Sequence, residues 1–434
     1  MPTPPPADVI EPHTAPAEIE TRAAFDQRLT TGSLTGLTVQ GLRLDLDPIP
    51  DLSGIEVTGT LFIGCRFASR DIGADLVRRG ANVVPPFSGL PYPTQPSHLY
   101  TPEELAAGFA DNGFAGMYDT RVYQHFRAHG GALPEVKEAL AQRLHDHGVD
   151  NALADATRAW LATHGPQSVV GIMGGHAVPR GSVPYRLAAT LGWELARADR
   201  LIVTGGGPGV MEAANLGAFL APYPAAELTA AIDLLAEAPD FTDHDRYTAA
   251  ALAVRQRYGR GAGVATASGG GTPTPAAPGG GAGAGGTGDG GVAGGGVPHQ
   301  RAVADVDWAR SGGLAIPTWL YGHEPANLFA GRIAKYFSNA IREDTILRLA
   351  RGGIVFAPGR AGTVQEVFQA ATKTFYGTDG ASGAYVFLDR AYWTRELPVE
   401  ALLRPLLAGS PFGDLAKSIH LTDDVHEAVQ ILTH

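Results

Sequence analysis

The sequence predicts an α/β protein whose core is an open, mostly parallel β-sheet with helices on both faces. Short apolar runs typical of buried strands recur from residue 168 to the C-terminus, and they alternate with helical patterns. Two of these strands lead into a helix through a glycine-rich turn, an arrangement that α/β folds use to bind phosphate groups. We therefore assign residues 165–434 to this core and residues 21–164 to an N-terminal accessory region with short β-strands and helices.

Residues 353–376, GIVFAPGRAGTVQEVFQAATKTFY, form the clearest strand–turn–helix unit. The apolar run at 354–356 predicts a buried strand, and residues 358–362 predict a tight turn. Thr363 and Glu366 have the spacing of a capping box, so we expect a helix to begin there, with a dipole that favours a bound anion. Glu366 has two interpretations: it only closes the capping box, or it is a carboxylate beside a bound phosphate ester, available for acid–base chemistry.

A second glycine loop follows the apolar run 201–203 and precedes a helical pattern at 211–221. The glycines of this loop are Gly205, Gly206, Gly207 and Gly209. An earlier predicted strand, within SVVGIMGG at 168–175, also ends in two glycines, Gly174 and Gly175. A single loop of this kind is often only a tight turn with close packing of helix on strand. The loop lacks the Lys-Ser or Lys-Thr ending of a P-loop, so we do not predict an NTPase.

The remaining core elements continue the alternation of strand and helix. Further strands are predicted near 314–319, at 384–389 and at 418–424, and helices at 184–198, 225–237, 245–258, 327–351 and 424–434. Residues 259–298 contain 18 glycines in 40 positions and predict a flexible insertion inside this domain.

The N-terminal part of the chain has a different pattern. Residues 1–20 are rich in Pro and Ala and predict a disordered tail. Residues 32–67 alternate apolar and polar side chains between Gly and Asp turns, as in one or two coils of a solenoid-like β layer. From 101 to 164 the pattern is helical, and Thr101 is the N-cap expected before a proline at the first helical position.

Composition excludes several classes of protein. The formal net charge of −11 argues against a nucleic-acid-binding protein, because phosphate backbones require concentrated Lys and Arg. There is no run of 18 uninterrupted apolar residues and no N-terminal signal peptide, so we predict no membrane span and a cytoplasmic location. The single cysteine, Cys65, leaves no internal disulfide and no cysteine-based metal site.

The two glycine-loop sequences, TGGGPGVMEAANLGA and APGRAGTVQE, together resemble the Lonely Guy (LOG) family, whose members were formerly called lysine decarboxylase-like. The family consists of Rossmann-like phosphoribohydrolases with the signature Pro-Gly-Gly-x-Gly-Thr-x-x-Glu. The resemblance covers roughly 168–434 apart from the insertion. The long N-terminal region and the sequence GHEP look most similar to the bacterial nucleotide 5′-monophosphate nucleosidases of this family. The signature is matched by Pro358, Gly359, Ala361, Gly362, Thr363 and Glu366, with Arg360 in place of the second glycine.

The resemblance implies hydrolysis of the N-glycosidic bond of a nucleoside 5′-monophosphate, giving free base and ribose 5-phosphate without a metal or cofactor. It implies that Glu366 and Arg342 are catalytic, and that the protein is a homodimer or larger homo-oligomer. Because bond cleavage develops positive charge on the ribose, a carboxylate near C1′ would stabilise that charge or activate water. Implied substrate-binding residues are Gly174, Gly175, Gly205, Gly206, Gly207, Gly209, Glu324, Gly359, Arg360, Gly362, Thr363 and Thr372.

Three positions depart from the family pattern. Arg360 brings a Cβ into the turn and either strains it or supplies a fork-shaped contact to phosphate. Arg342 is one residue out of the family register, where Glu343 stands, and Gln365 replaces an acidic residue. These departures motivate two alternatives, a catalytically inactive nucleotide-binding or sensing protein and an enzyme acting on another phosphosugar. His176 either contacts a ligand or caps a turn.

Overall fold

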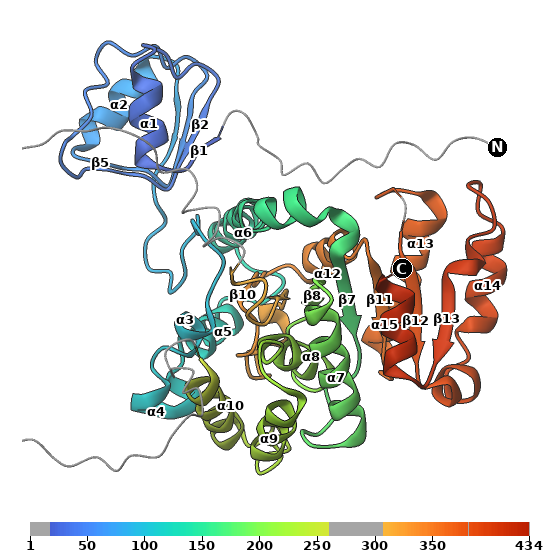
Figure 1. Ribbon diagram of the computed structural model, residues 1–434. Coiled ribbons are helices and arrows are strands. Elements are labelled where there is room, and N and C mark those ends of the chain that lie inside the picture. Colours follow the sequence, from blue (N-terminus) through green and yellow to red (C-terminus); the bar gives the residue numbers. More distant parts are fainter. Residues whose placement is uncertain (1–17, 260–306, 381, 434) are drawn as a thin grey trace, which may run out of the picture.

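The computed structural model describes residues 18–259, 307–380 and 382–433 (Figure 1). Most of the predicted tail and insertion therefore lies outside the described residues. The predicted tail ended too late in the chain, since Glu18–Ile19 already form a short strand, β1, that pairs with a later one.

The core is a seven-stranded sheet in which every pair of neighbouring strands is parallel, as predicted. The strand order is β10-β9-β8-β7-β11-β12-β13. The chain runs outward from β7 to β10 and then returns to the other side of β7, so the order of strands reverses between β7 and β11. Ligands of such sheets bind outside the carboxyl ends of the strands at this switch point. The strands are β7 Val169–Met173, β8 Leu201–Thr204, β9 Leu314–Ala315, β10 Arg332–Ile333, β11 Gly353–Phe356, β12 Ala384–Leu388 and β13 Ile419–Thr422.

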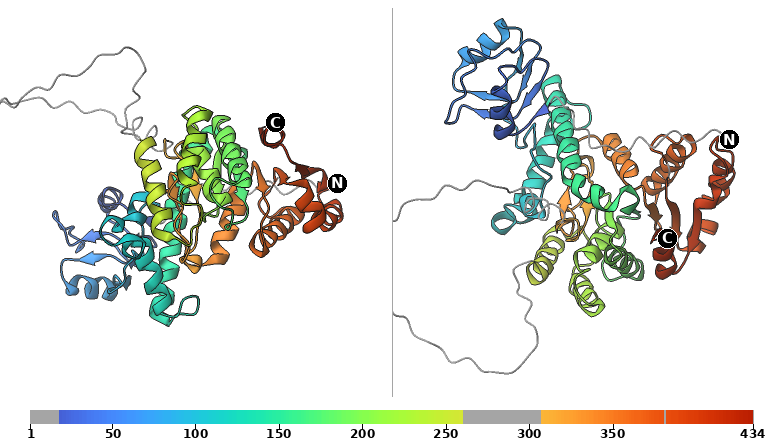
Figure 2. Two further views of the ribbon diagram at one scale, coloured as in Figure 1. Left: turned by 90° about the horizontal axis from the view of Figure 1, so that it is seen from below. Right: turned by 45° about the horizontal axis from the view of Figure 1, so that its top comes forward.

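Helices cover both faces of this sheet, which completes the predicted α/β architecture (Figures 1 and 2). Alternate residues of each buried strand enter opposite cores: Val355 packs with one set of helices, whereas Ile354 and Phe356 pack with the other. One face carries α7 Val183–Arg197, α8 Val210–Phe219, α9 Ala225–Leu235, α10 His244–Tyr258 and α15 Val425–Thr433. The other carries α12 Asn339–Leu349, α13 Ala361–Tyr376 and α14 Glu400–Ala408.

The helix predicted at 327–351 is wrong over its first half. That half contains the edge strand β10, and the helix α12 begins only after Ser338, whose hydroxyl accepts a hydrogen bond from the Ile341 N–H. Backbone pairing explains the difference, because the Ile333 N–H donates to the Tyr100 carbonyl and the Ala334 N–H donates to the Ala315 carbonyl. These partners come from distant segments, so the local apolar pattern did not reveal the strand.

The capping box predicted at Thr363 and Glu366 is also wrong. The N-cap of helix α13 is Arg360, three residues before the predicted Thr363, and no side chain caps the helix. Arg360 has a φ of −105°, which any L-residue adopts, so the turn carries no strain from its Cβ. Freed from capping, the Glu366 carboxylate takes a different partner, described below.

The N-terminal accessory region has two structurally different parts. Residues 18–84 form a small unit with its own hydrophobic core and parallel pairing, in which Thr38 lies beside Leu61 and Arg43 beside Arg66. Such pairing of successive segments is what a solenoid-like β layer requires. Figure 2 shows this unit at one end of the molecule. Its elements are β1, α1 Arg22–Leu29, β2 Thr38–Gln40, β3 Arg43–Leu44, β4 Leu61–Ile63, β5 Arg66–Phe67, α2 Arg70–Arg78 and β6 Asn82–Val84.

The helices after residue 101 pack on the sheet domain and share its hydrophobic core through Leu105, Val122 and Phe126. Thr101 is the N-cap of the first of them, within a complete capping box, as the sequence predicts. The four helices are α3 Pro102–Ala106, α4 Phe109–Gly116, α5 Tyr118–Ala128 and α6 Val136–His164. Within the described parts of the chain, none of the helices combines the length and apolar character needed to cross a bilayer.

Candidate functional site

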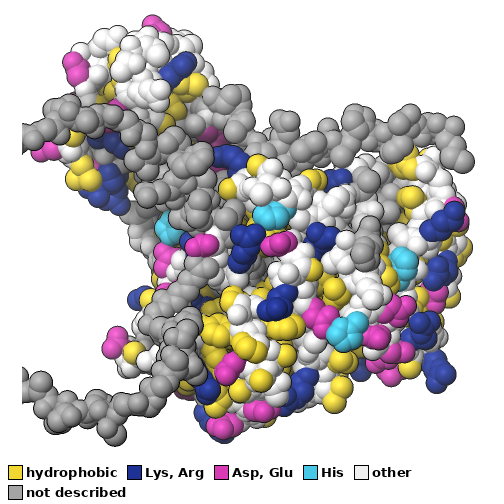
Figure 3. All heavy atoms as spheres, in the orientation of Figure 1, with side chains coloured by type: hydrophobic (Ala, Val, Ile, Leu, Met, Phe, Trp, Pro, Cys, Tyr) yellow, Lys and Arg dark blue, Asp and Glu magenta, His cyan; other side chains and the backbone are white. Residues whose placement is uncertain are grey.

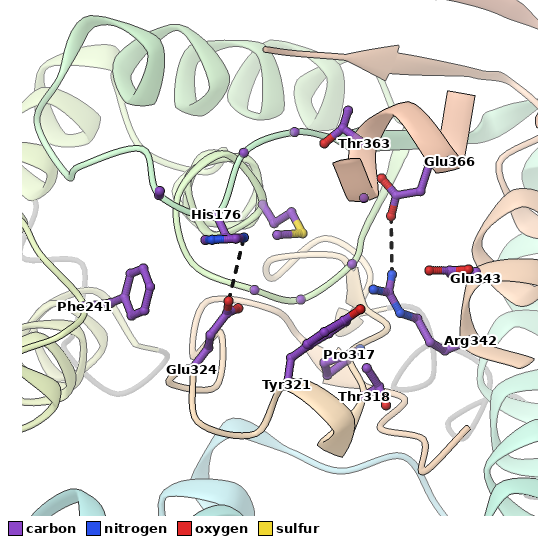
Figure 4. A pocket seen from close by; sticks show the side chains of 18 of the residues that line it. His176, Phe241, Pro317, Thr318, Tyr321, Glu324, Arg342, Glu343, Thr363 and Glu366 are labelled. Carbon is purple, nitrogen blue, oxygen red and sulfur yellow. Dashed lines mark hydrogen bonds and ion pairs between the residues drawn. The ribbon is translucent and has the colours of Figure 1, made fainter. Parts of the chain in front are cut away.

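A pocket of about 450 Å³ opens at the carboxyl ends of the central strands, where the strand order reverses (Figure 4). It contains most of the residues that the sequence singles out. Of the predicted residues, Gly174, Gly175, Gly205, Gly206, Gly207, Glu324, Arg342, Arg360, Gly362, Thr363 and Glu366 line it. The two glycine loops, which follow β8 and β11, therefore reach one cavity, although residues 205–207 and 360–363 are far apart in sequence.

Three predicted residues do not line this pocket. Thr372 lies on the exposed side of α13, where its hydroxyl donates to the Phe368 carbonyl within the helix. Gly209 and Gly359 lie behind the pocket wall and hold the loops together. A Cβ at Gly209, whose φ is +71°, would overlap the Gly175 carbonyl oxygen. The Gly359 carbonyl accepts a hydrogen bond from the Tyr392 hydroxyl.

Backbone hydrogen bonds join the loops that follow β7, β8 and β11. The Gly175 N–H donates to the Pro358 carbonyl at 2.9 Å, and the Val210 N–H donates to the Gly175 carbonyl at 3.2 Å. Helix α13 begins at this junction without a side-chain cap, so N–H groups of its first turn remain available beside Gly362 and Thr363. Those groups and the helix dipole favour a bound anion.

Arg342 and Glu366 form an ion pair on the wall of the pocket, with Nη1 and Oε1 3.4 Å apart (Figure 4). The side chain of Arg342 is 10% exposed and that of Glu366 12% exposed. Asn339 fixes the arginine from the same helix by accepting a hydrogen bond from its Nε at 2.9 Å. A Cβ at Gly205 would lie 3.3 Å from the Arg342 Nη1, so the glycine leaves room for the guanidinium.

Burial raises the pKa of Glu366 to about 7. The Arg342 guanidinium acts in the opposite direction and lowers this pKa, whereas the nearby Glu343 carboxylate raises it. The side chain is consequently poised to exchange a proton near neutral pH, as a general base or acid requires.

Glu343, which stands at the family's arginine position, and Gln365, which replaces an acidic residue, compensate each other. Glu343 accepts a hydrogen bond at 2.7 Å from the Gln365 amide, and another at 2.8 Å from Asn339. A neutral amide at position 365 therefore suits the carboxylate at position 343, whereas two carboxylates there would repel each other. The shift of register still leaves Arg342 facing Glu366, because both Arg342 and Glu343 point toward the pocket.

Glu324 and His176 lie on the side of the pocket away from Arg342 and Glu366 (Figure 4). The Nδ1 of His176 lies 3.7 Å from Oε1 of Glu324, and the imidazole packs edge-on against Phe241. His176 therefore faces the cavity and does not cap a turn through this ring nitrogen. Burial raises the pKa of Glu324, and the charges of His176 and His323 lower it.

Several pocket residues carried no recognisable signal in the sequence. Lys335 was assigned to the first half of the helix predicted at 327–351, which is not helical. Phe241 and Tyr321 lie in connecting segments without a motif. Only the GHEP sequence, which contains Glu324, pointed to the loop that supplies Tyr321. Within the described residues, no group of three or more His, Cys, Asp or Glu side chains is arranged to hold a metal ion.

The fold and the pocket define a Rossmann-like α/β protein with a cavity at its topological switch point, where proteins of this fold bind ligands. Residues 167–221, which span β7, α7, β8 and α8, match the SLOG cluster4 family. The SLOG superfamily includes LOG-like nucleotide-binding proteins of this fold, so a nucleotide-related role is supported, although the LOG family itself did not match. No curated protein matches the chain.

Proposed function

We propose that this protein hydrolyses the N-glycosidic bond of a nucleoside 5′-monophosphate. The observation that carries the proposal is the buried Glu366 carboxylate, with its pKa near 7, paired with Arg342 beside two glycine loops. A reactive carboxylate next to an anion site is the combination that a phosphorylated ribosyl substrate needs.

The phosphate of the substrate binds at the N-terminus of α13. Arg360 supports this placement, because its exposed side chain lines the pocket and has no ion-pair partner among the described residues. Its planar guanidinium matches two phosphate oxygens, and the first-turn N–H groups of α13 supply further donors. Gly362 leaves space beside them, since no atom lies within 4 Å of the position of a Cβ there.

The chemistry follows from this placement. The bond from C1′ to the base nitrogen breaks, its electron pair passes to the base, and positive charge develops on the ribose ring. Ionised Glu366 stabilises that charge, or accepts a proton from the water whose oxygen bonds to C1′. The water divides into the hydroxyl that bonds to C1′ and a proton that ends on the base, so the products are free base and ribose 5-phosphate.

The second candidate function is binding of the nucleotide without turnover. Two observations favour it: Glu366 is already engaged by Arg342, and Arg360 occupies a glycine position of the LOG signature. Nucleotide binding without base release distinguishes this candidate from the first.

Base release from a panel of nucleoside 5′-monophosphates, followed by chromatography, tests the proposal. We expect wild type to release base and Glu366→Gln to lose activity by about 10²-fold or more. Glu400→Gln is the matched control, because Glu400 pairs with Arg404 on α14, outside the pocket. Release of base by Glu366→Gln at the wild-type rate would contradict the assignment of Glu366.

The predicted assembly into a homodimer or larger oligomer stays a prediction. Light scattering of the full-length protein measures its mass in solution and tests the prediction directly.

A further inference from the structure

Lys335 is a buried cation that the proposed reaction does not use. It follows the edge strand β10, lines the pocket, and has a side chain that is only 3% exposed. Its Nζ lies 2.6 Å from an oxygen of Asp119, which is itself buried and belongs to α5 of the accessory region. The same oxygen accepts a hydrogen bond from the Trp319 indole at 2.9 Å.

This arrangement leaves the ammonium group with unused hydrogen-bonding capacity. An ammonium group has three N–H donors, and Asp119 is the one anion paired with it among the described residues. The ring of Trp319 covers another side of the ammonium at 5.5 Å. A buried donor that faces a cavity is costly to leave without an acceptor, so a bound ligand is expected to supply one.

The order of strands separates Lys335 from the phosphate site. Lys335 follows β10 at one end of the row, the glycine loops follow β8 and β7, and the N-terminus of α13 follows β11. A nucleotide whose phosphate lies at α13 therefore directs its base toward β9 and β10. That end of the pocket has flat, apolar surfaces from Pro317 and Tyr321, which suit a planar base.

Charge also opposes a phosphate at this end. Asp119 neutralises Lys335, and the carboxylate of Glu324 lines the same region. A doubly charged phosphate would be repelled by Glu324 and would gain little from a cation that is already paired. A neutral carbonyl oxygen needs only a donor, which Lys335 provides.

We propose that Lys335 donates a hydrogen bond to the exocyclic oxygen of the base and thereby selects oxo-bases over amino-bases. Guanine, hypoxanthine and uracil carry an oxygen where adenine and cytosine carry an amino group, and an ammonium group cannot accept a hydrogen bond from that amino group. Asp119 is then a positioning residue, through which the accessory region contributes to specificity. This inference rests on the proposed nucleotide ligand but not on its hydrolysis.

Inosine and adenosine 5′-monophosphates are the sharpest probes, because the two bases differ only along this edge. Their dissociation constants for the full-length wild-type protein are measured by calorimetry. We expect the inosine nucleotide to bind at least about tenfold more tightly, since the adenine amino group leaves the buried donor unpaired. Equal affinities for the two nucleotides, or no binding of either one, would overturn the inference from the wild-type measurements alone.

The variant is Lys335→Met combined with Asp119→Asn, because methionine alone would leave a buried aspartate unpaired. We expect the preference for the inosine nucleotide to disappear in this variant, with the fold checked by circular dichroism. Lys373→Met is the matched control, since Lys373 pairs with Asp344 and Asp379 away from the pocket. A preference that persists in a folded double variant would show that another group reads the base.

Base release measured on the same samples separates the two proposals. Selective binding without base release leaves the role of Lys335 standing and contradicts the hydrolase. Base release at equal rates from both nucleotides, with equal affinities, supports the hydrolase and contradicts the role of Lys335.

Discussion

At the scale of single residues, the behaviour of the site depends on the protonation of Glu366. Burial raises the pKa of its carboxyl to about 7, and the guanidinium of Arg342 at 3.4 Å keeps it from rising further. Both of its proposed roles, stabilising a cation and accepting a proton from water, require the ionised form. The proposed activity is therefore linked to this one titration.

We predict that base release accelerates as pH rises through about 7 and then levels off. Arg342→Met removes the cation that favours the carboxylate, so the midpoint of the profile should move to higher pH as the overall rate falls. Initial rates between about pH 5.5 and 8.5 test both statements. A midpoint near the ordinary pKa of glutamate would contradict the first.

The raised pKa of Glu366 also makes the stability of the folded protein depend on pH. The pKa of Glu366 is higher in the folded protein than the value of 4.5 in the unfolded chain. Its contribution to stability is therefore fully present below about pH 4.5 and is lost as pH rises through about 7. Glutamine does not ionise, so Glu366→Gln does not undergo this loss. We expect the free energy of unfolding of the variant, relative to that of wild type, to be higher at pH 8 than at pH 5 by about 1–3 kcal/mol. Urea unfolding at the two pH values measures the difference.

At the scale of elements, the site is a junction of three strand-to-helix turns that meet closely enough to exclude side chains. Gly209 shows the constraint most clearly, because it combines a φ of +71° with contacts to two backbone carbonyls. A Cβ there would overlap the Gly175 oxygen and lie 2.7 Å from the His176 oxygen. The loop that follows β11 also leads to the N–H groups that we propose bind the phosphate, so the packing of these loops and the proposed binding are linked.

We predict that Gly209→Ala destabilises the protein by about 1–3 kcal/mol, because backbone atoms must move to admit the methyl group. Gly362→Ala is the control for stability. It lies in the first turn of α13 with no atom within 4 Å of its Cβ position, so its effect should stay below about 1 kcal/mol. Thermal denaturation measures the loss of stability in each variant. Equal losses in the two variants would contradict the close approach of the loops at Gly209.

At the scale of the whole molecule, the accessory helices hold the site in place. The Asp146 carboxylate of α6 accepts hydrogen bonds from the N–H groups of Phe337 and Ser338 at 2.8 and 2.9 Å. Ser338 caps α12, which carries Arg342. From α5, Asp119 binds Lys335, as described above. The accessory region therefore supports both the wall that carries Arg342, which we propose to be catalytic, and the proposed base-recognition wall of the pocket.

We predict that Asp146→Ala destabilises the protein by about 2–4 kcal/mol, because it leaves the buried N–H of Phe337 and the half-buried N–H of Ser338 without partners. Base release should also fall, since the start of α12 loses its anchor. Asp233→Ala is the matched control, because Asp233 forms an exposed ion pair with Arg186 and should change stability by less than about 1 kcal/mol. Retention of wild-type stability by Asp146→Ala would contradict the anchoring role.

Some features of the fold and the pocket follow from the local sequence, and others do not. The buried strands, the glycine loops and Glu366 were predictable, because apolar runs followed by glycines and helical patterns report local conformation. Lys335 and Asp119 were not, because they come from segments without a motif and meet only in the folded chain. The edge strand β10 was mistaken for helix because its conformation depends on pairing with β9 and on a single bridge to Tyr100, both distant in sequence.

The sequence by itself determined the class of fold and the glycine-rich turns that follow the buried strands, since both depend on the conformational preferences of neighbouring residues. Only the tertiary structure decided which side chains face one another. One residue along a helix turns a side chain by about 100°, so whether Arg342 or Glu343 meets Glu366 depended on how α12 packs on the sheet. The raised pKa of Glu366 arises from burial by residues distant in sequence, which no local pattern encodes.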